Sequence, residues 1–226
     1  MKKLSHLYLI GALFAWLPAV AQEHLSWRTD GTVIRDGTPL KTRLQVVYSA
    51  LAADQGLYLA GDIIDSKGIN HPQIVFVAAD QSTPQYWPQT HSVNQFFLYQ
   101  GHTYSVLYNG QALVRKGKQW LPSPLAFKQD PTVVYNRDDL VACTPRPLEK
   151  ETRVQGSCYS LGKGWSTDID WQHTAPAVCQ GTLTALVKVR KQWLAQQLSL
   201  ADGRLLASAP LAQPVNDLCS IRFDKP

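Results

Sequence analysis

The chain has 226 residues, 45% of them hydrophobic, and its 22 basic and 17 acidic residues give a formal charge of +5 at pH 7. A chain of this length can bury a hydrophobic core without covalent staples, as one large β domain or two small ones. Its basic residues are dispersed, and the densest group, at residues 115–118, is typical of a solvent-exposed turn. The composition therefore gives no support to a nucleic-acid partner.

The N-terminal segment has the pattern of a secretory signal peptide. Lysines at positions 2 and 3 precede an apolar run at residues 7–17, and the small residues 19–21 follow. We expect residues 1–21 to be removed on export, which leaves residues 22–226 as a single β-rich domain in the bacterial periplasm or outside the cell. The apolar run is shorter than the roughly 20 residues that span a bilayer, and no later run is apolar enough to do so. We therefore expect no membrane insertion.

Short turn motifs predict β-hairpins along the chain. An Asp-Gly or Asn-Gly pair between two strand-like segments favours a two-residue hairpin turn, because both turn positions adopt positive φ. Around Asn109-Gly110 the pattern predicts a three-stranded meander over residues 103–122. Four hairpins of one kind are expected, with turns at Asp30-Gly31, Asn109-Gly110, Gly162-Lys163-Gly164 and Asp202-Gly203.

Further segments add strands, and no helix is predicted after residue 21. Residues 193–200 contain the helix formers Ala, Gln and Leu, but they fold more economically as one arm of the hairpin at Asp202-Gly203. Proline-rich segments are expected to be connections between the strands, because proline cannot donate to a β-ladder and therefore suits loops and sheet edges; they lie at residues 84–88, 122–124, 145–147 and 210–214. The other predicted strands lie at residues 44–48, 56–60, 74–78, 96–99, 132–135, 140–143 and 182–189.

A tripeptide pattern recurs between residues 96 and 211. Lys118-Gln119-Trp120, Lys163-Gly164-Trp165 and Lys191-Gln192-Trp193 each place a lysine two residues before a tryptophan, at intervals of 45 and 28 residues. The first interval resembles that of β-propeller repeats, which are about 40–50 residues long, although the signatures of WD and kelch repeats are missing. The resemblance implies an all-β fold of antiparallel meanders, propeller-like with four or five blades. A β-sandwich or open barrel is the alternative.

All four cysteines lie in the C-terminal part, and an even number in an exported chain predicts two disulfides. Three pairings are possible. Nearest-neighbour pairing suits a meander, and it would join Cys143 to Cys158 and Cys179 to Cys219. No two of these cysteines have the spacing of a zinc knuckle, and the histidines show no metal-ligand spacing, so we expect no metal and no cofactor.

The sequence contains no Gly-x-Ser-x-Gly nucleophile motif, and the remaining candidates for catalysis are carboxylates. Asp168 and Asp170 would share one face of a strand, so they, with Asp138, are candidate acids. The pairs Asp62 with Asp65, Asp138 with Asp139, and Asp168 with Asp170 are all explained more simply as turn-forming aspartates.

Aromatic residues suggest where a partner could bind. Tyr86 and Trp87 lie between two prolines, in a predicted loop, and Trp165 and Trp171 flank an acidic stretch. We expect an exported, non-enzymatic binding protein that uses such residues to hold a protein partner, for example as an inhibitor or immunity-type protein. The alternative is a carbohydrate-active hydrolase or glycan-binding protein, with Trp165 and Trp171 as its sugar platform beside the candidate acids.

Overall fold

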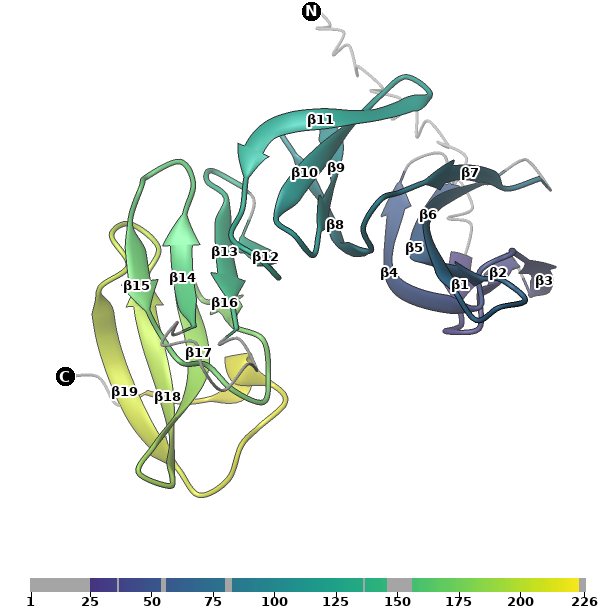
Figure 1. Cartoon of the computed structure of the whole chain (residues 1–226). Coiled ribbons are helices and arrows are strands. Elements are labelled where there is room, and N and C mark those ends of the chain that lie inside the picture. Colours follow the sequence, from purple (N-terminus) through teal and green to yellow (C-terminus); the bar gives the residue numbers. More distant parts are fainter. Residues whose placement is uncertain are drawn as a thin grey trace, which may run out of the picture.

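The computed structural model describes residues 25–35, 37–53, 56–79, 83–135, 137–145 and 156–223, and the expected signal peptide lies outside them. These residues form 19 strands in five antiparallel sheets, and each sheet follows the chain as a meander (Figure 1). The only helix described is the 3₁₀ turn η1 (Leu218–Ser220). No helix in this part of the chain is long and apolar enough to cross a membrane.

One sheet has three strands and four sheets have four. The β1–β3 sheet contains β1 (Leu25–Trp27), β2 (Thr32–Arg35) and β3 (Thr38–Lys41). The β4–β7 sheet contains β4 (Val46–Ala53), β5 (Gly56–Ile64), β6 (Asn70–Ala78) and β7 (Gln85–Pro88). The β8–β11 sheet contains β8 (Val93–Tyr99), β9 (His102–Leu107), β10 (Gln111–Lys116) and β11 (Gln119–Ala126).

The two C-terminal sheets repeat the same order of strands. The β12–β15 sheet contains β12 (Thr132–Tyr135), β13 (Val141–Thr144), β14 (Ser157–Ser160) and β15 (Ser166–Asp168). The β16–β19 sheet contains β16 (Ala177–Cys179), β17 (Thr182–Val189), β18 (Gln192–Ser199) and β19 (Leu205–Leu211).

The four-stranded sheets follow one another along an open arc (Figure 1). The first strand of each sheet contacts the first strand of the next, from β4 to β8, β8 to β12 and β12 to β16. This is a propeller-like arrangement of blades, as the sequence predicted, and no sheet is closed into a barrel. We call the side of the arc at which these four strands begin the N-terminal rim, and the opposite side the C-terminal rim.

Apolar cores fill the interfaces between consecutive sheets. On β5, Tyr58 and Ala60 face the β8–β11 sheet, whereas Leu57 and Leu59 face the β1–β3 sheet, as the two-residue period of a strand requires. The same alternation on β17 sends Leu183, Ala185 and Val187 toward the β12–β15 sheet and Leu186 outward.

The outward faces of the two end sheets are both covered. The β1–β3 sheet packs on the β4–β7 sheet through Val33 and Leu40. At the other end, residues 212–223 cross the β16–β19 sheet, where Leu218, Ile221 and Phe223 pack against its outer face. The Cys179–Cys219 disulfide fastens this C-terminal segment to β16.

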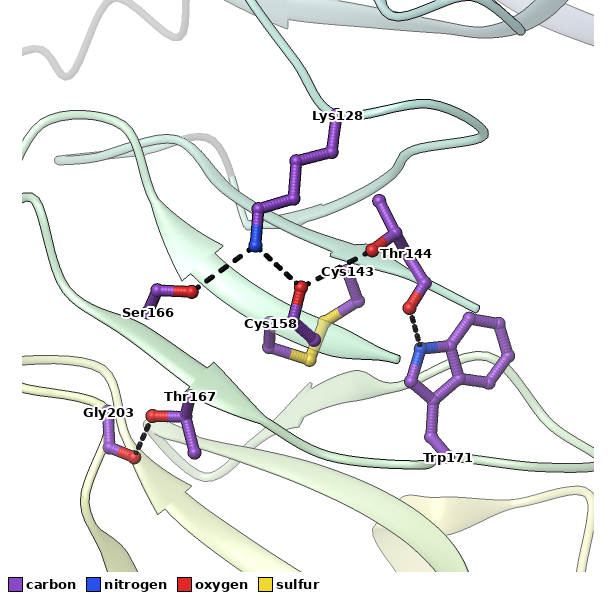
Figure 2. Close-up of a disulfide and its surroundings, with 9 residues drawn as sticks. Lys128, Cys143, Thr144, Cys158, Ser166, Thr167, Trp171 and Gly203 are labelled. Carbon is purple, nitrogen blue, oxygen red and sulfur yellow. Dashed lines mark hydrogen bonds between the residues drawn. A yellow bond between two sulfur atoms is a disulfide. The ribbon is translucent and has the colours of Figure 1, made fainter. Parts of the chain in front are cut away.

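The structure pairs the cysteines as nearest neighbours. Cys143 and Cys158 stand directly opposite each other on β13 and β14, and their disulfide lies in the core toward the β16–β19 sheet (Figure 2). Sheet pairing therefore brings these two cysteines together, whereas the second disulfide, Cys179–Cys219, joins segments 40 residues apart.

All four predicted hairpins are confirmed. The turn at Asn109-Gly110 joins β9 to β10, and Asn109 accepts a hydrogen bond from the N–H of Gln111. The turn at Asp202-Gly203 joins β18 to β19, so residues 193–200 form a strand and not a helix. The other two turns join β1 to β2 and β14 to β15.

The expectation that proline-rich segments form connections was wrong in three of the four places. Pro88 lies in β7, Pro122 and Pro124 in β11, and Pro210 in β19. Each of these is the last strand of its sheet and has no neighbour on one side, so a proline nitrogen that faces this open side costs no ladder bond. The fourth segment lies beyond the described residues after Pro145.

The tryptophan pattern marks equivalent positions only twice. Trp120 lies near the start of β11, and Trp165 immediately precedes β15, so both lead into the last strand of their sheets. Trp193 lies in β18, the third strand of its sheet. The shorter second interval of 28 residues therefore reflects a different structural position, not a shorter sheet.

Candidate functional site

Tyr86 and Trp87 lie on β7, not in the loop that the flanking prolines suggested. The hydroxyl of Tyr86 accepts the N–H of Arg43 at 2.9 Å, and the indole of Trp87 donates to the carbonyl of Lys118 at 3.0 Å. The guanidinium of Arg115 lies over the Trp87 ring, 4.4 Å from its centroid. The two side chains thus contact different neighbouring sheets and do not form one surface.

Trp165 and Trp171 both pack at the interface between the β12–β15 and β16–β19 sheets. The indole of Trp165 donates to the carbonyl of Leu200 at 3.2 Å, and that of Trp171 donates to Thr144 at 3.0 Å (Figure 2). Leu200 belongs to the C-terminal rim and Thr144 to the N-terminal rim. The structure does not bring the two indoles together.

The candidate acids are also divided between the two rims. Asp168 is the exposed last residue of β15, and its register partner is Ser157, so Asp168 and the nearby Asp170 lie at the N-terminal rim. Asp138 lies in the turn between β12 and β13, at the other end of the sheet, where it accepts the hydroxyl of Tyr135 at 3.2 Å. No group of three His, Cys, Asp or Glu residues able to hold a metal occurs in the described ranges.

Asp139 is a buried structural carboxylate next to the exposed Asp138. It accepts the N–H groups of Leu140 at 2.7 Å and Gly162 at 2.8 Å, and the hydroxyl of Ser160 donates to its second oxygen. Ser160 in turn accepts the N–H of Lys163. Asp139 therefore fixes the β14–β15 turn, and all its bonds serve the fold.

Lys128 anchors the link between two sheets to the β12–β15 sheet through hydroxyl groups (Figure 2). It lies in the link between β11 and β12, and its Nζ donates to Ser157 at 2.8 Å and to Ser166 at 3.4 Å. The same ammonium lies 4.8 Å from the centroid of the Tyr159 ring, whose hydroxyl accepts the Lys128 N–H. Ser157 is buried within a strand, so this cluster anchors the link and does not present a nucleophile.

A different cluster lies at the N-terminal rim, between the β4–β7 and β8–β11 sheets. Tyr48 of β4 donates its hydroxyl to Oδ2 of Asp62 on β5, at 2.5 Å. Tyr108 belongs to the β9–β10 turn, and its carbonyl accepts the N–H of Asp130, which precedes β12, at 2.7 Å. We call Tyr48, Asp62, Tyr108 and Asp130 the tyrosine–aspartate site.

Two β-bulges shape this site. Tyr48 is the extra residue where the β4–β5 register shifts, and Asn94 is the extra residue where the β8–β9 register shifts. A bulge turns its side chain away from the regular alternation of the strand. Asn94 donates to Oδ1 of Asp130 at 3.2 Å and to the carbonyl of Pro131 at 2.6 Å, so the second bulge holds Asp130 in place.

Gly61 allows the first bulge to form. A Cβ at this position would lie 1.9 Å from the carbonyl oxygen of Val46 on β4, so a larger residue would force the two strands apart. Glycine permits such a close approach of two backbones. This close approach lies next to Tyr48 and Asp62 in the β4–β5 pair.

The site combines exposed rings with a buried charge. Tyr48 is 43% exposed and Tyr108 is 41% exposed, whereas Asp62 is only 1% exposed. Oδ1 of Asp62 is shielded from solvent and has no hydrogen-bond partner among the described residues. A buried carboxylate with half of its acceptors unused is costly unless something compensates it.

The pKa values of both tyrosine hydroxyls are raised at this site. Partial burial, the hydrogen bond to Asp62 and the charge of that carboxylate raise the pKa of Tyr48 to about 12. Burial and the charges of Asp130 and Asp62 also raise the pKa of Tyr108. Both rings are therefore neutral at physiological pH.

The sequence interpretation missed this site because it treated Asp62 and Asp65 alike. Asp65 does stabilise a turn, since it accepts the N–H groups of Lys67 and Ile69. Asp62 instead lies within β5, two residues after Ala60 on the same face. Extending the predicted strand past Gly61 to Ile63 and Ile64 would have placed Asp62 on the face toward the next sheet.

Comparisons with known proteins give fold similarity only. No protein-family model and no curated protein sequence matches the chain. The computationally designed protein Ika8 is 11% identical with a TM-score of 0.45, over 82% of this chain and 70% of that one. A structure described as an oxidoreductase (glucose dehydrogenase), from Thermus thermophilus, is 12% identical with a TM-score of 0.47, over 85% of this chain and 81% of that one.

A third similar structure is PorZ, a bacterial surface component of the type-IX secretion system of Porphyromonas gingivalis. It is 11% identical with a TM-score of 0.34, over 79% of this chain and 30% of that one. At these identities and scores, none of the three assigns a family or an activity to the chain.

Proposed function

We propose that the chain is an exported binding protein that holds a protein partner at the N-terminal rim of an incomplete β-propeller. The observation that carries the proposal is the half-exposed ring of Tyr48, whose hydroxyl donates to the buried carboxylate of Asp62, together with the half-exposed Tyr108 of the next sheet at the same rim, whose carbonyl accepts the N–H of Asp130. Tyrosine provides a large, rigid contact area at a low entropic cost, which is why it is enriched at the centres of protein interfaces.

Apolar exposure at the same rim supports a macromolecular partner. Ile69, in the loop between β5 and β6, is 53% exposed, and Val189, at the end of β17, is also exposed. Together with the two tyrosines they spread large apolar side chains over the first, second and fourth four-stranded sheets. A partner that spans several blades would cover them.

Export is part of the proposal. The two disulfides favour an oxidising compartment, and the N-terminal pattern of residues 1–21 favours passage across the inner membrane. Within this class, an inhibitor or immunity-type protein remains the form we favour. The test is mass spectrometry of the protein recovered from periplasmic and culture fractions, where an N-terminus at Gln22 is expected and an uncleaved Met1 in the cytoplasm would contradict export.

The binding proposal is tested by capture from the same fractions. Tagged mature protein should retain one specific partner, and the double substitution Tyr48→Ala with Tyr108→Ala should release it. Tyr86→Phe and Tyr135→Phe serve as matched controls, because they alter tyrosines outside the site. Retention by the double variant, or equal loss with the controls, would place the partner elsewhere. Binding to a glycan array that Asp168→Asn abolishes would favour the glycan-binding alternative instead.

A further inference from the structure

The tyrosine–aspartate site holds two carboxyl groups with no basic side chain paired to either of them among the described residues. Among the described residues, no lysine, arginine or histidine lies within ion-pair distance of Asp62 or Asp130, although such pairs do form at Asp65 with His71 and at Asp202 with Arg204. Asp62 is almost completely buried, with Oδ1 unpartnered. Buried carboxyl groups in proteins are normally hydrogen-bonded or paired, so a positive group would satisfy Oδ1 of Asp62.

The tyrosine rings at this site are also suited to contact a positively charged group. A guanidinium or ammonium ion is attracted to the face of a tyrosine ring, and the chain already uses this contact where Arg43 lies over Tyr86 and Arg115 over Trp87. Tyr48 and Tyr108 remain substantially exposed, so their rings are open to a partner's side chain.

The site is also held in position before any ligand arrives. Asn94 bonds Asp130 and the carbonyl of Pro131, while Tyr48 bonds Asp62. Two bulges and one close strand approach at Gly61 support these bonds. Groups fixed in this way lose little conformational entropy when a ligand binds.

From this geometry we infer that the tyrosine–aspartate site binds a cationic group, the guanidinium or ammonium of a basic side chain presented by the protein partner. The inference rests on the proposed function and specifies the chemistry that the partner brings to the site. The cation would contact the Tyr48 and Tyr108 rings and neutralise the carboxylates of Asp62 and Asp130, where low local dielectric strengthens the attraction.

The direct test uses a small probe with one positive charge. We would titrate N-acetyl-arginine amide into the mature protein and follow backbone NMR shifts, with N-acetyl-citrulline amide as the neutral analogue of the same shape. Arginine amide should shift resonances of residues 46–49, 61–63 and 107–110, and citrulline amide should not. N-acetyl-lysine amide distinguishes a requirement for charge alone from a requirement for the planar guanidinium.

Two substitutions assign the effect to the carboxylates. Asp62→Asn and Asp130→Asn should each weaken arginine amide binding about tenfold or more, which corresponds to about 1.4 kcal/mol. Asp138→Asn is the matched control, because Asp138 also accepts a tyrosine hydroxyl but lies at the other rim. Asp130 adopts a positive φ of 51°, which asparagine tolerates well, so Asp130→Asn keeps the test valid even if Asp62→Asn fails to fold.

Equal shifts with citrulline amide, absence of binding, or an affinity that both substitutions leave unchanged would overturn the inference. The proposed function is judged separately by partner capture. If Asp62→Asn and Asp130→Asn still capture the partner while the tyrosine double variant does not, the binding function stands and the cation-binding inference fails. If capture is lost in all three variants and arginine amide behaves as expected, both are supported.

Discussion

The hydroxyl of Tyr48 lies 2.5 Å from the carboxylate of Asp62, and this bond joins an exposed ring to one of the most deeply buried charges in the molecule. The two residues lie 14 positions apart and meet because β4 bulges at Tyr48, opposite Gly61. Their hydrogen bond therefore contributes both to the stability of the β4–β7 sheet and to the geometry of the tyrosine–aspartate site.

This bond predicts a stability effect that depends on pH. Tyr48→Phe removes the donor and leaves both oxygens of Asp62 without a partner, which should cost about 1–3 kcal/mol of unfolding free energy at neutral pH. The pKa of Tyr48 is raised to about 12 in the folded protein, from about 10 when unfolded. Because the folded state holds the proton more tightly, this contribution is complete below pH 10 and declines as the pH rises toward 12.

The measurement is urea denaturation of the wild type and Tyr48→Phe across that pH range. The difference between their unfolding free energies should shrink above pH 10. Tyr86→Phe serves as the control, since its hydroxyl only accepts a backbone N–H. A constant difference up to pH 12 would show that the phenol proton does not contribute to stability.

The adjacent residues Asp138 and Asp139 should respond very differently to substitution by alanine. Asp139→Ala would orphan the N–H groups of Leu140 and Gly162 and the hydroxyl of Ser160, so a loss of about 3 kcal/mol or more is expected. Asp138→Ala removes one exposed bond to Tyr135 and should change stability by less than about 0.5 kcal/mol. Thermal unfolding of both variants checks this, and a loss for Asp139→Ala as small as that expected for Asp138→Ala would mean that the turn does not depend on Asp139.

The two disulfides should differ in their response to a mild reductant. Cys143 and Cys158 are fully buried, whereas Cys219 is exposed in the C-terminal segment. Alkylation and mass spectrometry under native conditions should therefore label Cys179 and Cys219 first. Replacing those two by serine should cost about 4 kcal/mol, because the bridge closes a loop of 40 residues. Earlier labelling of Cys143 would contradict the packing of the β13–β14 pair.

A methyl group at position 61 should disturb both the fold and the site. Gly61→Ala places a Cβ 1.9 Å from the carbonyl oxygen of Val46, so we expect a loss of about 1–3 kcal/mol from the forced separation of β4 and β5. Gly68→Asn is the control, because Gly68 has open space around it and asparagine tolerates its positive φ. Denaturation curves report the loss. NMR shifts of Tyr48 would report the displaced bulge, and unchanged curves and shifts would refute the role given to Gly61.

The sequence predicted the hairpins well because a hairpin turn is specified by a few adjacent residues. Asn109-Gly110 specifies its turn through two residues suited to positive φ, and the structure joins β9 and β10 there. The pairing of Cys143 with Cys158 follows from the same logic, since both belong to neighbouring strands of one meander. The propeller-like order of sheets is a repetition of these units.

The candidate site depends on relationships that no local pattern encodes. Tyr48 and Asp62 meet only because a bulge shifts the register of β4 by one residue. Tyr108 lies at the same rim only because the next sheet packs against β5. Tyr86 and Trp87 looked like a loop because prolines flank them, yet an edge strand accepts prolines as readily as a loop does.

The open arc of sheets also determines where unfolding of the molecule begins. In a closed ring each sheet would be clamped by two others, but here the described sheets form a line whose members touch mainly their neighbours, so unfolding can start at either end and proceed inward. The Cys179–Cys219 bridge locks one end. The β1–β3 sheet is held by packing and hydrogen bonds alone, so its amides should exchange with solvent first. The rim tyrosines lie on the next sheets along, where fraying from that end would reach Tyr48 before any other part of the site.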